Sequence, residues 1–239
     1  MKTRLLSILL LICCTTISAY ENIPFQVLDV KSGISDNYIQ DILCDKYGFM
    51  WFASKNGLDR YDGYHFKQYP TKHLGSYDNS VEGIFEDASG TIWIKTPVRY
   101  CFYNREKDEF DNRLNNRLCS LGIRDSVKGL YVDEDRNLWC STADSIHYYR
   151  FSEETLFSVK IPGNGELLDL TCRQSNAYLL FAGGEIATVD WSSGKVSPES
   201  FVELIPDLNH HIYLDTEGGL WLYATHSSTL LCYSTRDRK

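Results

Sequence analysis

A motif that returns four times constrains the fold of this chain more than any other feature. In each copy an Asp stands six residues before a Trp, and an aliphatic or Met residue directly precedes that Trp. Successive Trp residues of the motif are 42, 46 and 82 positions apart, and 82 is close to two further periods. A period of this length marks a supersecondary repeat, so we expect an array of stacked units. The motif positions are Asp45, Gly48, Trp51, Asp87, Gly90, Trp93, Asp133, Trp139, Asp215, Gly218 and Trp221.

A fifth, degenerate copy is expected in the long gap between Trp139 and Trp221. Tyr178 stands at the Trp place, while Cys172 and Ser175 stand at the Asp and Gly places. The chain is therefore predicted to carry five repeats, four of them clean.

The first unit shows why these residues repeat. Apolar and polar residues alternate over short runs, which is typical of strands, and Asp-x-x-Gly suits a tight hairpin between the first two runs. Such a four-stranded sheet needs neighbouring sheets to cover its two faces. We therefore predict an all-β fold, a β-propeller of four-stranded antiparallel blades with about five blades visible; an open, linear β-solenoid is the alternative. The expected strands of this unit are 38–43, 49–53, 58–61 and 64–69.

Composition agrees with one large all-β domain and limits its partners. Aromatic residues make up 13% of the 239 residues, as packing between blades requires. The formal net charge of −8 argues against a nucleic-acid partner, because binding to phosphates needs a basic surface.

The N-terminus has the features of an export signal. A cationic start, the apolar run Leu5–Ile12 and small residues before the cleavage point predict a signal peptide over 1–19 and a propeller over 20–239. We expect the product to be exported. Lipidation of Cys13 or Cys14 is disfavoured, because the residues before each are not small, and no later segment is a candidate membrane span.

No cofactor, metal site or catalytic constellation is expected. Asp133 and the two acidic residues after it lack the Gly and the distal Glu of a calcium loop, so they are assigned to a hairpin turn. The motif Asp residues are likewise assigned to turns, the motif Trp residues to packing between blades, and the pair His210 and His211 to the surface. Mostly free, buried thiols are expected for the six remaining cysteines, which are Cys44, Cys101, Cys119, Cys140, Cys172 and Cys232.

The first unit also resembles a known family, the two-component regulator propeller repeat. The residues that carry the resemblance are Ser32–Ile39, Ile42–Ser54, Asn56–Gly63 and Phe66–Tyr69. The later units depart from the family pattern, because they lack its Gly-Leu-x-Arg-Tyr-Asp-Gly turn. The resemblance is clearest over 31–70, is weaker at 81–103, 127–149 and 210–233, and is faintest at 165–190.

The resemblance implies a receptor. Such repeats build the periplasmic sensor of hybrid two-component systems of Bacteroidetes, in which propellers precede a membrane helix, a histidine kinase and a response regulator. The chain matches only the N-terminal part, and no kinase motif is found in it, so we expect no enzymatic activity. The expected function is recognition of glycan-derived oligosaccharides and signalling to a kinase absent from this chain; a membrane contact would come only through the missing C-terminal part or through lipidation.

Two other functions and two ring closures stay open. A free-standing scaffold for protein partners, including a homodimer through propellers, is the first alternative, and a carbohydrate-active enzyme is the second. A strand is expected over 25–30, and it could supply the fourth strand of a last unit whose own strands are 211–214, 220–224 and 229–233. That exchange would close a five-bladed ring. An incomplete seven-bladed ring is favoured over it, because the family usually closes with more blades.

A ligand is expected at one mouth of the central channel. The loops there are the turns between the second and third strands and the connections between blades. Their aromatic, amide and cationic groups suit a carbohydrate, especially an acidic one. The candidate residues are Lys55, Asn56, Tyr77, Asn79, Arg99, Asp144, His210 and His226.

Overall fold

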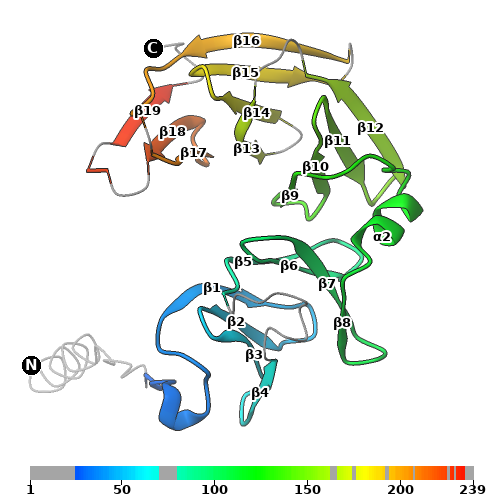
Figure 1. The fold of residues 1–239 in the computed structure, drawn as a ribbon, viewed down its shortest axis with the longest axis vertical. Coiled ribbons are helices and arrows are strands. Elements are labelled where there is room, and N and C mark those ends of the chain that lie inside the picture. The colour runs from blue at the N-terminus through cyan, green and yellow to red at the C-terminus, as the bar shows by residue number, and fades with distance from the viewer. Residues whose placement is uncertain are drawn as a thin grey trace, which may run out of the picture.

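The protein is an all-β, five-bladed β-propeller whose first four blades are four-stranded antiparallel sheets and whose fifth has three strands within the described residues. Figure 1 shows the blades following one another along an arc, with the first and last blades at its two ends. The computed structural model describes residues 25–69, 80–161, 166–173, 176–191, 194–206, 208–224, 227–228 and 230–234.

Each blade is a separate sheet whose strands follow one another in chain order. Blade 1 contains β1 (Ile39–Cys44), β2 (Met50–Ser54), β3 (Gly57–Tyr61) and β4 (Phe66–Tyr69). Blade 2 contains β5 (Gly83–Glu86), β6 (Ile92–Lys95), β7 (Tyr100–Asn104) and β8 (Glu109–Asp111), and helix α2 (Leu114–Ser120) follows it. Blade 3 contains β9 (Gly129–Val132), β10 (Leu138–Ser141), β11 (Ser145–Arg150) and β12 (Thr155–Lys160). Blade 4 contains β13 (Leu167–Arg173), β14 (Asn176–Phe181), β15 (Glu185–Asp190) and β16 (Lys195–Phe201). Blade 5 contains β17 (His210–Leu214), β18 (Gly219–Ala224) and β19 (Leu230–Ser234).

The order of strands divides the loops between two faces of the arc. The first strand of each blade lies on the inner side of the arc, and the last lies on the outer side (Figure 1). Because neighbouring strands are antiparallel, the first-to-second and third-to-fourth hairpins share one face, which we call the hairpin face. The second-to-third turns and the connections between blades share the opposite face, which we call the connection face.

Each complete motif is held by one hydrogen bond that the repeat spacing produces. The indole Nε1 of Trp51 donates to Oδ2 of Asp45 at 2.8 Å, and the corresponding bonds of the other copies measure 2.8, 2.9 and 2.7 Å. The second carboxylate oxygen accepts backbone N–H groups of the same hairpin, such as that of Phe49 at 3.1 Å. The Asp therefore closes its turn and orients the Trp at once.

The hairpins need a left-handed residue three positions after the Asp. Gly48, Gly90 and Gly218 have φ angles of 87°, 82° and 88°, a region in which glycine carries no side-chain penalty. Blade 3 has Arg136 there, with φ 61°. A residue with a Cβ is strained in this conformation, and its long side chain reaches across to blade 2, as described below.

The hydrophobic core lies between neighbouring blades. Trp51, Trp93 and Trp139 are fully buried, each in a cluster that combines its own blade with the next one. The ring of Trp51 meets Tyr103 of blade 2 edge-on, with 4.9 Å between ring centroids. Trp139 stacks on Tyr148 at 4.2 Å and meets Trp191 of blade 4 at 5.1 Å. These contacts stack the sheets face to face.

The fourth blade corrects one assignment. Tyr178 pairs with Thr171 as Trp51 pairs with Leu43, so Tyr178 does occupy the Trp place. The same register puts Arg173, and not Cys172, at the place of the motif Asp. The hairpin of blade 4 is one residue shorter than those of the other blades. Counting six residues back from Tyr178 therefore gave Cys172 as the Asp position, one residue too early.

The predicted N-terminal strand is wrong. Residues 25–29 form no strand, and Val30–Ser32 form a short 3-10 helix. Asp29 caps this helix by accepting from the backbone N–H of Ser32 at 3.0 Å, and Gly33 ends it in the left-handed region. Within the described residues, blade 5 therefore has three strands and receives none from the N-terminus. The helix α2 was not predicted either.

The cysteines show how the two end blades differ from the others. All six cysteines of the described part are free thiols, and Cys101 and Cys140 are buried as expected. Cys119 in α2 is exposed, which contradicts the expected burial. Cys44 and Cys232 are exposed as well. They lie on the outward faces of blades 1 and 5, against which no further blade packs in the described part of the chain (Figure 1).

The predicted signal peptide, residues 1–19, lies outside the described residues. Within the described ranges, no helix is long and apolar enough to cross a bilayer.

Candidate ligand site on the hairpin face

The described members of the predicted ligand set lie on the connection face but do not form one cluster. Lys55, Asn56, Arg99 and Asp144 are exposed in second-to-third turns. Among the described members of the set, no hydrogen bond or ion pair joins one to another. Lys55 instead lies over the ring of Tyr38, and Asp144 pairs with Lys160. Tyr77, Asn79 and His226 lie outside the described residues.

His210 departs from the expected exposure. Its side chain is buried, and its Nε2 accepts the backbone N–H of Ile205 at 3.0 Å. The connection from blade 4 passes next to the start of β17 and covers the ring. His211 is half-buried, with its Nδ1 3.2 Å from Oδ2 of Asp169. The two neighbouring histidines point to opposite faces of β17, so His210 contacts the connection from blade 4 and His211 contacts Asp169 in β13.

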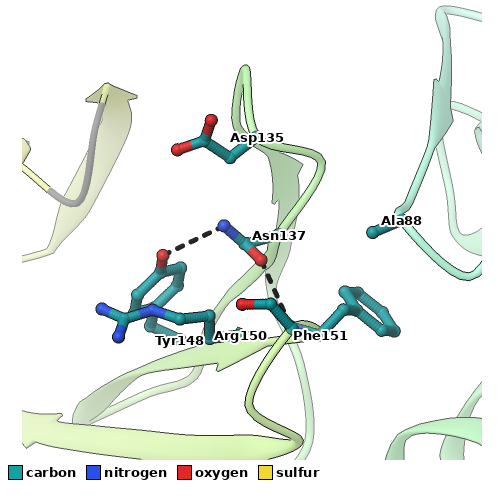
Figure 2. Close-up of a pocket in the computed structure, with 7 residues that line it drawn as sticks. Ala88, Asp135, Asn137, Tyr148, Arg150 and Phe151 are labelled. Atoms are coloured by element: carbon teal, nitrogen blue, oxygen red, sulfur yellow. Dashed lines mark hydrogen bonds between the residues drawn. The ribbon is translucent and has the colours of Figure 1, made fainter.

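A substantial hollow lies on the hairpin face, opposite to the predicted mouth. Its volume is about 520 Å³, and it is bordered by the hairpins of blade 3 and by the first hairpin of blade 2 (Figure 2). This volume falls in the range that small-ligand sites occupy. The lining residues are Ala88, Asp135, Asn137, Tyr148, Arg150, Phe151 and Ser152.

Asn137 holds the two hairpins of blade 3 together. Its Nδ2 donates to Oη of Tyr148 at 3.1 Å, and its Oδ1 accepts the backbone N–H of Phe151 at 3.2 Å (Figure 2). The side chain is buried, so both ends of the amide are satisfied inside the fold. The floor of the hollow is therefore rigid before any ligand arrives.

Arg150 supplies the cationic wall of the hollow. Its guanidinium lies 5.5 Å from the ring centroid of Tyr148 and 5.2 Å from that of Phe157, and its Nη1 is 2.7 Å from Oε1 of Glu153. Hydrogen bonding to Tyr148 and to Glu153 raises the pKa of Arg150. Asp135 presents an exposed carboxylate at the opposite rim (Figure 2). An aromatic surface bordered by a guanidinium and a carboxylate suits a polar ligand with an apolar face, such as a sugar.

A second hollow, of about 440 Å³, lies between the outer strands of blades 1 and 2. Its carboxylate, Asp108, accepts hydrogen bonds from Tyr69 at 2.6 Å, from Tyr103, and from Lys67 and Arg60. These donors hold the pKa of Asp108 well below its usual range despite the opposing effect of burial, and burial raises that of Tyr69. Because these groups satisfy one another across the two blades, we assign this cluster to inter-blade cohesion.

The acidic hairpin of blade 3 behaves as a turn. Asp133 accepts from Trp139 Nε1 at 2.9 Å and from the backbone N–H of Asn137 at 2.8 Å. Within the described ranges, no group of three or more His, Cys, Asp or Glu side chains is arranged to hold a metal ion.

Sequence reasoning missed a buried histidine in blade 3. His147 lies in β11, and its Nδ1 is 2.8 Å from Oγ of Ser158 in β12. Its Nε2 is buried and lies 3.6 Å from Oδ2 of Asp125, beyond hydrogen-bond distance. The apolar and polar pattern of β11 gives no sign of this, because all its first four residues are buried.

We expect His147 to make the protein less stable in mild acid. Burial lowers the pKa of His147 below its ordinary 6.5, and Asp125 and Asp144 offset part of that effect. Between the pKa of His147 in the folded protein and 6.5, the unfolded chain therefore binds more protons than the folded chain. The stability that comes from a neutral His147 is fully present above pH 6.5, and it is lost as the pH falls toward the pKa of the folded state. Urea unfolding at about pH 7.5 and about pH 5.5 measures it. His147→Gln should show a smaller difference between the two conditions, and an equal difference would contradict the assignment.

Comparison with known proteins agrees with this architecture. Residues 33–56 match the family model described as two component regulator propeller. The extracellular domain ascribed to a hybrid two-component system of B. thetaiotaomicron is similar to this chain, with 23% identity and a TM-score of 0.61; the likeness covers 90% of this chain and 31% of that one. A second extracellular domain of the same organism, ascribed to a one-component system, has 18% identity and a TM-score of 0.57, over 84% of this chain and 28% of its own length.

A propeller enzyme shares the fold as well. Virginiamycin B lyase from Staphylococcus aureus has 13% identity and a TM-score of 0.52, and the likeness covers 83% of this chain and 67% of the lyase. A comparison with curated proteins finds no match. The chain thus spans about a third of the length of the first structural relative, 31%, and the likeness to these structures concerns the fold.

Proposed function

We propose, from the premise that this chain carries a two-component regulator propeller repeat at residues 33–56, that it is the ligand-sensing propeller of an exported two-component sensor. Its ligand is an oligosaccharide derived from a glycan, and its signal passes to a histidine kinase. The similar extracellular domains of B. thetaiotaomicron support a sensory propeller outside the cytoplasm. Within this proposal the sensor is periplasmic, and ligand recognition at its sensing site involves no catalysis.

The observation that carries the proposal is the hollow on the hairpin face. Phe151, which is half-buried, offers an aromatic side chain, Arg150 offers a guanidinium, and Asp135 offers a carboxylate (Figure 2). Tyr148, which is buried and held in place by Asn137, lines the floor of the hollow. A pyranose presents an apolar face and a rim of hydroxyl groups, so these groups match its two kinds of surface. The guanidinium in addition favours a sugar that carries a carboxylate.

The position of the hollow also suits signalling. Its lining comes from blades 2 and 3, with Ala88 on one side and the hairpins of blade 3 on the other. A ligand that contacts both blades binds one relative placement of them better than another, and it shifts the population by that difference in affinity. The resulting change in the arrangement of the blades would be the signal to a downstream kinase.

A scaffold role is the second candidate, and one surface favours it. The outward face of blade 5 exposes the aromatic side chains Tyr213 and Tyr223 and, nearby, Leu230. Exposed apolar groups of this kind are typical of surfaces that bind a protein partner or a second copy. A concentration-dependent mass in sedimentation, lost when Tyr213 and Leu230 are replaced by Ser, would support this role.

We expect Arg150→Ala to weaken oligosaccharide binding about tenfold or more, because a hydrogen bond to a charged group contributes about 1.5–3 kcal/mol. The measurement is a thermal-shift screen of the protein with plant and host oligosaccharides, in which a ligand of the folded state raises the melting temperature by mass action. The variant should melt like the parent without ligand and should lose most of the ligand-induced rise.

Arg99→Ala is the matched control, since Arg99 is an exposed arginine on the connection face. It should keep the full rise in melting temperature. If Arg99→Ala abolishes the rise and Arg150→Ala leaves it intact, the ligand binds on the connection face and the hairpin-face site is wrong. If no oligosaccharide raises the melting temperature of the parent, glycan sensing by this chain is not supported.

A further inference from the structure

Blade 3 carries a serine, a histidine and a carboxylate in a row, remote from the hollow on the hairpin face. Ser158 lies in β12 directly opposite His147 in β11, and the two form a cross-strand pair. Their side chains meet, with 2.8 Å between Ser158 Oγ and His147 Nδ1. The far nitrogen of the ring, Nε2, lies 3.6 Å from Oδ2 of Asp125. This order of groups is the general arrangement of an activated nucleophile, its base and the group that orients the base.

The exposure of the three side chains suits nucleophilic catalysis, which needs an accessible nucleophile and a base held in place. Ser158 is exposed on the outer strand, so a substrate can reach its hydroxyl. His147 is buried, and its Nε2 makes no hydrogen bond within the described residues. Asp125 comes from the connection between α2 and β9 and stays largely exposed, with its Oδ2 3.6 Å from Nε2.

The protonation of the histidine also fits. Burial favours a neutral ring, and a neutral ring with its proton on Nε2 points that proton at Asp125 and leaves the Nδ1 lone pair for the Ser158 hydroxyl. The charged groups that act on His147 are Asp125, Asp144 and Lys160. Lys160 lies two residues from Ser158 on the same face of β12, and its ammonium is paired with Asp144.

We propose that Ser158 and His147, with Asp125 as positioning residue, form a nucleophilic site that hydrolyses small carboxylic esters. Because Ser158 lies exposed on a strand, we expect the acyl group to be a short one such as acetyl. The neighbouring thiol of Cys140, which pairs with His147 across β10 and β11, is not the nucleophile: it is fully buried, and burial raises its pKa to about 12.

The reaction balances with water as the only co-reactant. Ser158 Oγ forms a bond to the ester carbonyl carbon, and its proton moves to His147 Nδ1. The tetrahedral oxyanion collapses, the bond from carbon to the alcohol oxygen breaks, and the alcohol leaves with the proton from His147. Water then attacks the acyl-serine with His147 as base, which releases the carboxylic acid and restores the Ser158 hydroxyl.

The first test is covalent labelling of the whole chain by a fluorophosphonate, followed by mass spectrometry of the peptides. We expect the label on Ser158, and no label there in His147→Gln. Ser120→Ala is the matched control, because Ser120 is an exposed serine at the end of α2 that lacks a histidine partner. It should keep full labelling. Absence of label on Ser158 in the parent protein would overturn the proposal.

The second test is hydrolysis of 4-nitrophenyl acetate against pH. Ser158→Ala should lose the protein-dependent rate, and His147→Gln should lose roughly 100-fold or more. Asp125→Asn should shift the acidic limb of the profile to lower pH, because Asp125 raises the pKa of His147; a merely structural role would leave the limb in place. A rate unchanged in Ser158→Ala would sink the assignment, and equal melting temperatures of the variants exclude unfolding as the cause of any loss.

Discussion

Replacing Trp139 by Ala is expected to lower the free energy of unfolding by about 3–5 kcal/mol. The side chain is fully buried between blades 3 and 4, stacked on Tyr148 at 4.2 Å and against Trp191 at 5.1 Å. Its removal opens a large cavity at this interface. It also deprives Asp133 of the indole donor at 2.9 Å, which leaves a buried carboxylate with one partner fewer.

Urea unfolding followed by circular dichroism measures this loss. Trp221→Ala is the matched control, because it removes the same motif hydrogen bond, here 2.7 Å, from the last blade, where no further blade packs against the ring in the described part of the chain. We expect less than half the loss for Trp221→Ala. Equal losses for the two variants would mean that the hydrogen bond, and not the packing between blades, stabilises the motif.

Removing the carboxylate of Glu86 should cost about 3 kcal/mol, near the lower end for a broken buried ion pair. Glu86 lies in blade 2 and joins three blades: its Oε2 is 2.8 Å from Nη1 of Arg136 in blade 3, and it accepts the backbone N–H of Lys46 in blade 1 at 3.1 Å. Arg105 approaches it at 3.7 Å. The Glu86 side chain is fully buried, whereas Arg136 is about half exposed and recovers hydration when its partner is lost, which moderates the cost.

The measurement is the unfolding free energy of Glu86→Ala, compared with Glu82→Ala at the start of the same blade. Glu82 pairs with Lys95 at 3.2 Å, but both side chains are exposed by more than a third, so this pair should contribute less than about 1 kcal/mol. A loss for Glu86→Ala no larger than that for Glu82→Ala would show that the three-blade network adds nothing to stability.

The local sequence pattern was sufficient to predict the blades. The Asp and Trp at fixed spacing predicted the hairpins, and the alternation in each unit predicted strands such as β2 and β18 to within about a residue. The structure adds what the spacing did not state, namely that Oδ2 of Asp45 accepts the indole N–H of Trp51. These features are short-range, because the partners lie within a few residues on one hairpin.

The local sequence pattern gave wrong predictions where contacts outside the repeat unit determine the secondary structure or the burial of a residue. Residues 25–30 have the alternation of an edge strand, but a strand needs a partner, and Asp29 instead caps a short helix. His210 is hydrophilic and was expected at the surface, but the connection from blade 4 covers it. Cys44 sits in an apolar strand and is exposed, because no blade packs on that face in the described part of the chain.

The candidate sites show the same contrast between what local sequence determines and what the tertiary structure decides. The sequence by itself determined that this chain builds stacked blades of short antiparallel strands, because turn chemistry and period-two burial act within one unit. Only the tertiary structure decided that Asn137, Tyr148 and Arg150 border one hollow and that Glu86 joins three blades. It also decided that Ser158 faces His147, because strand register sets that pair and no residue spacing along the chain records it.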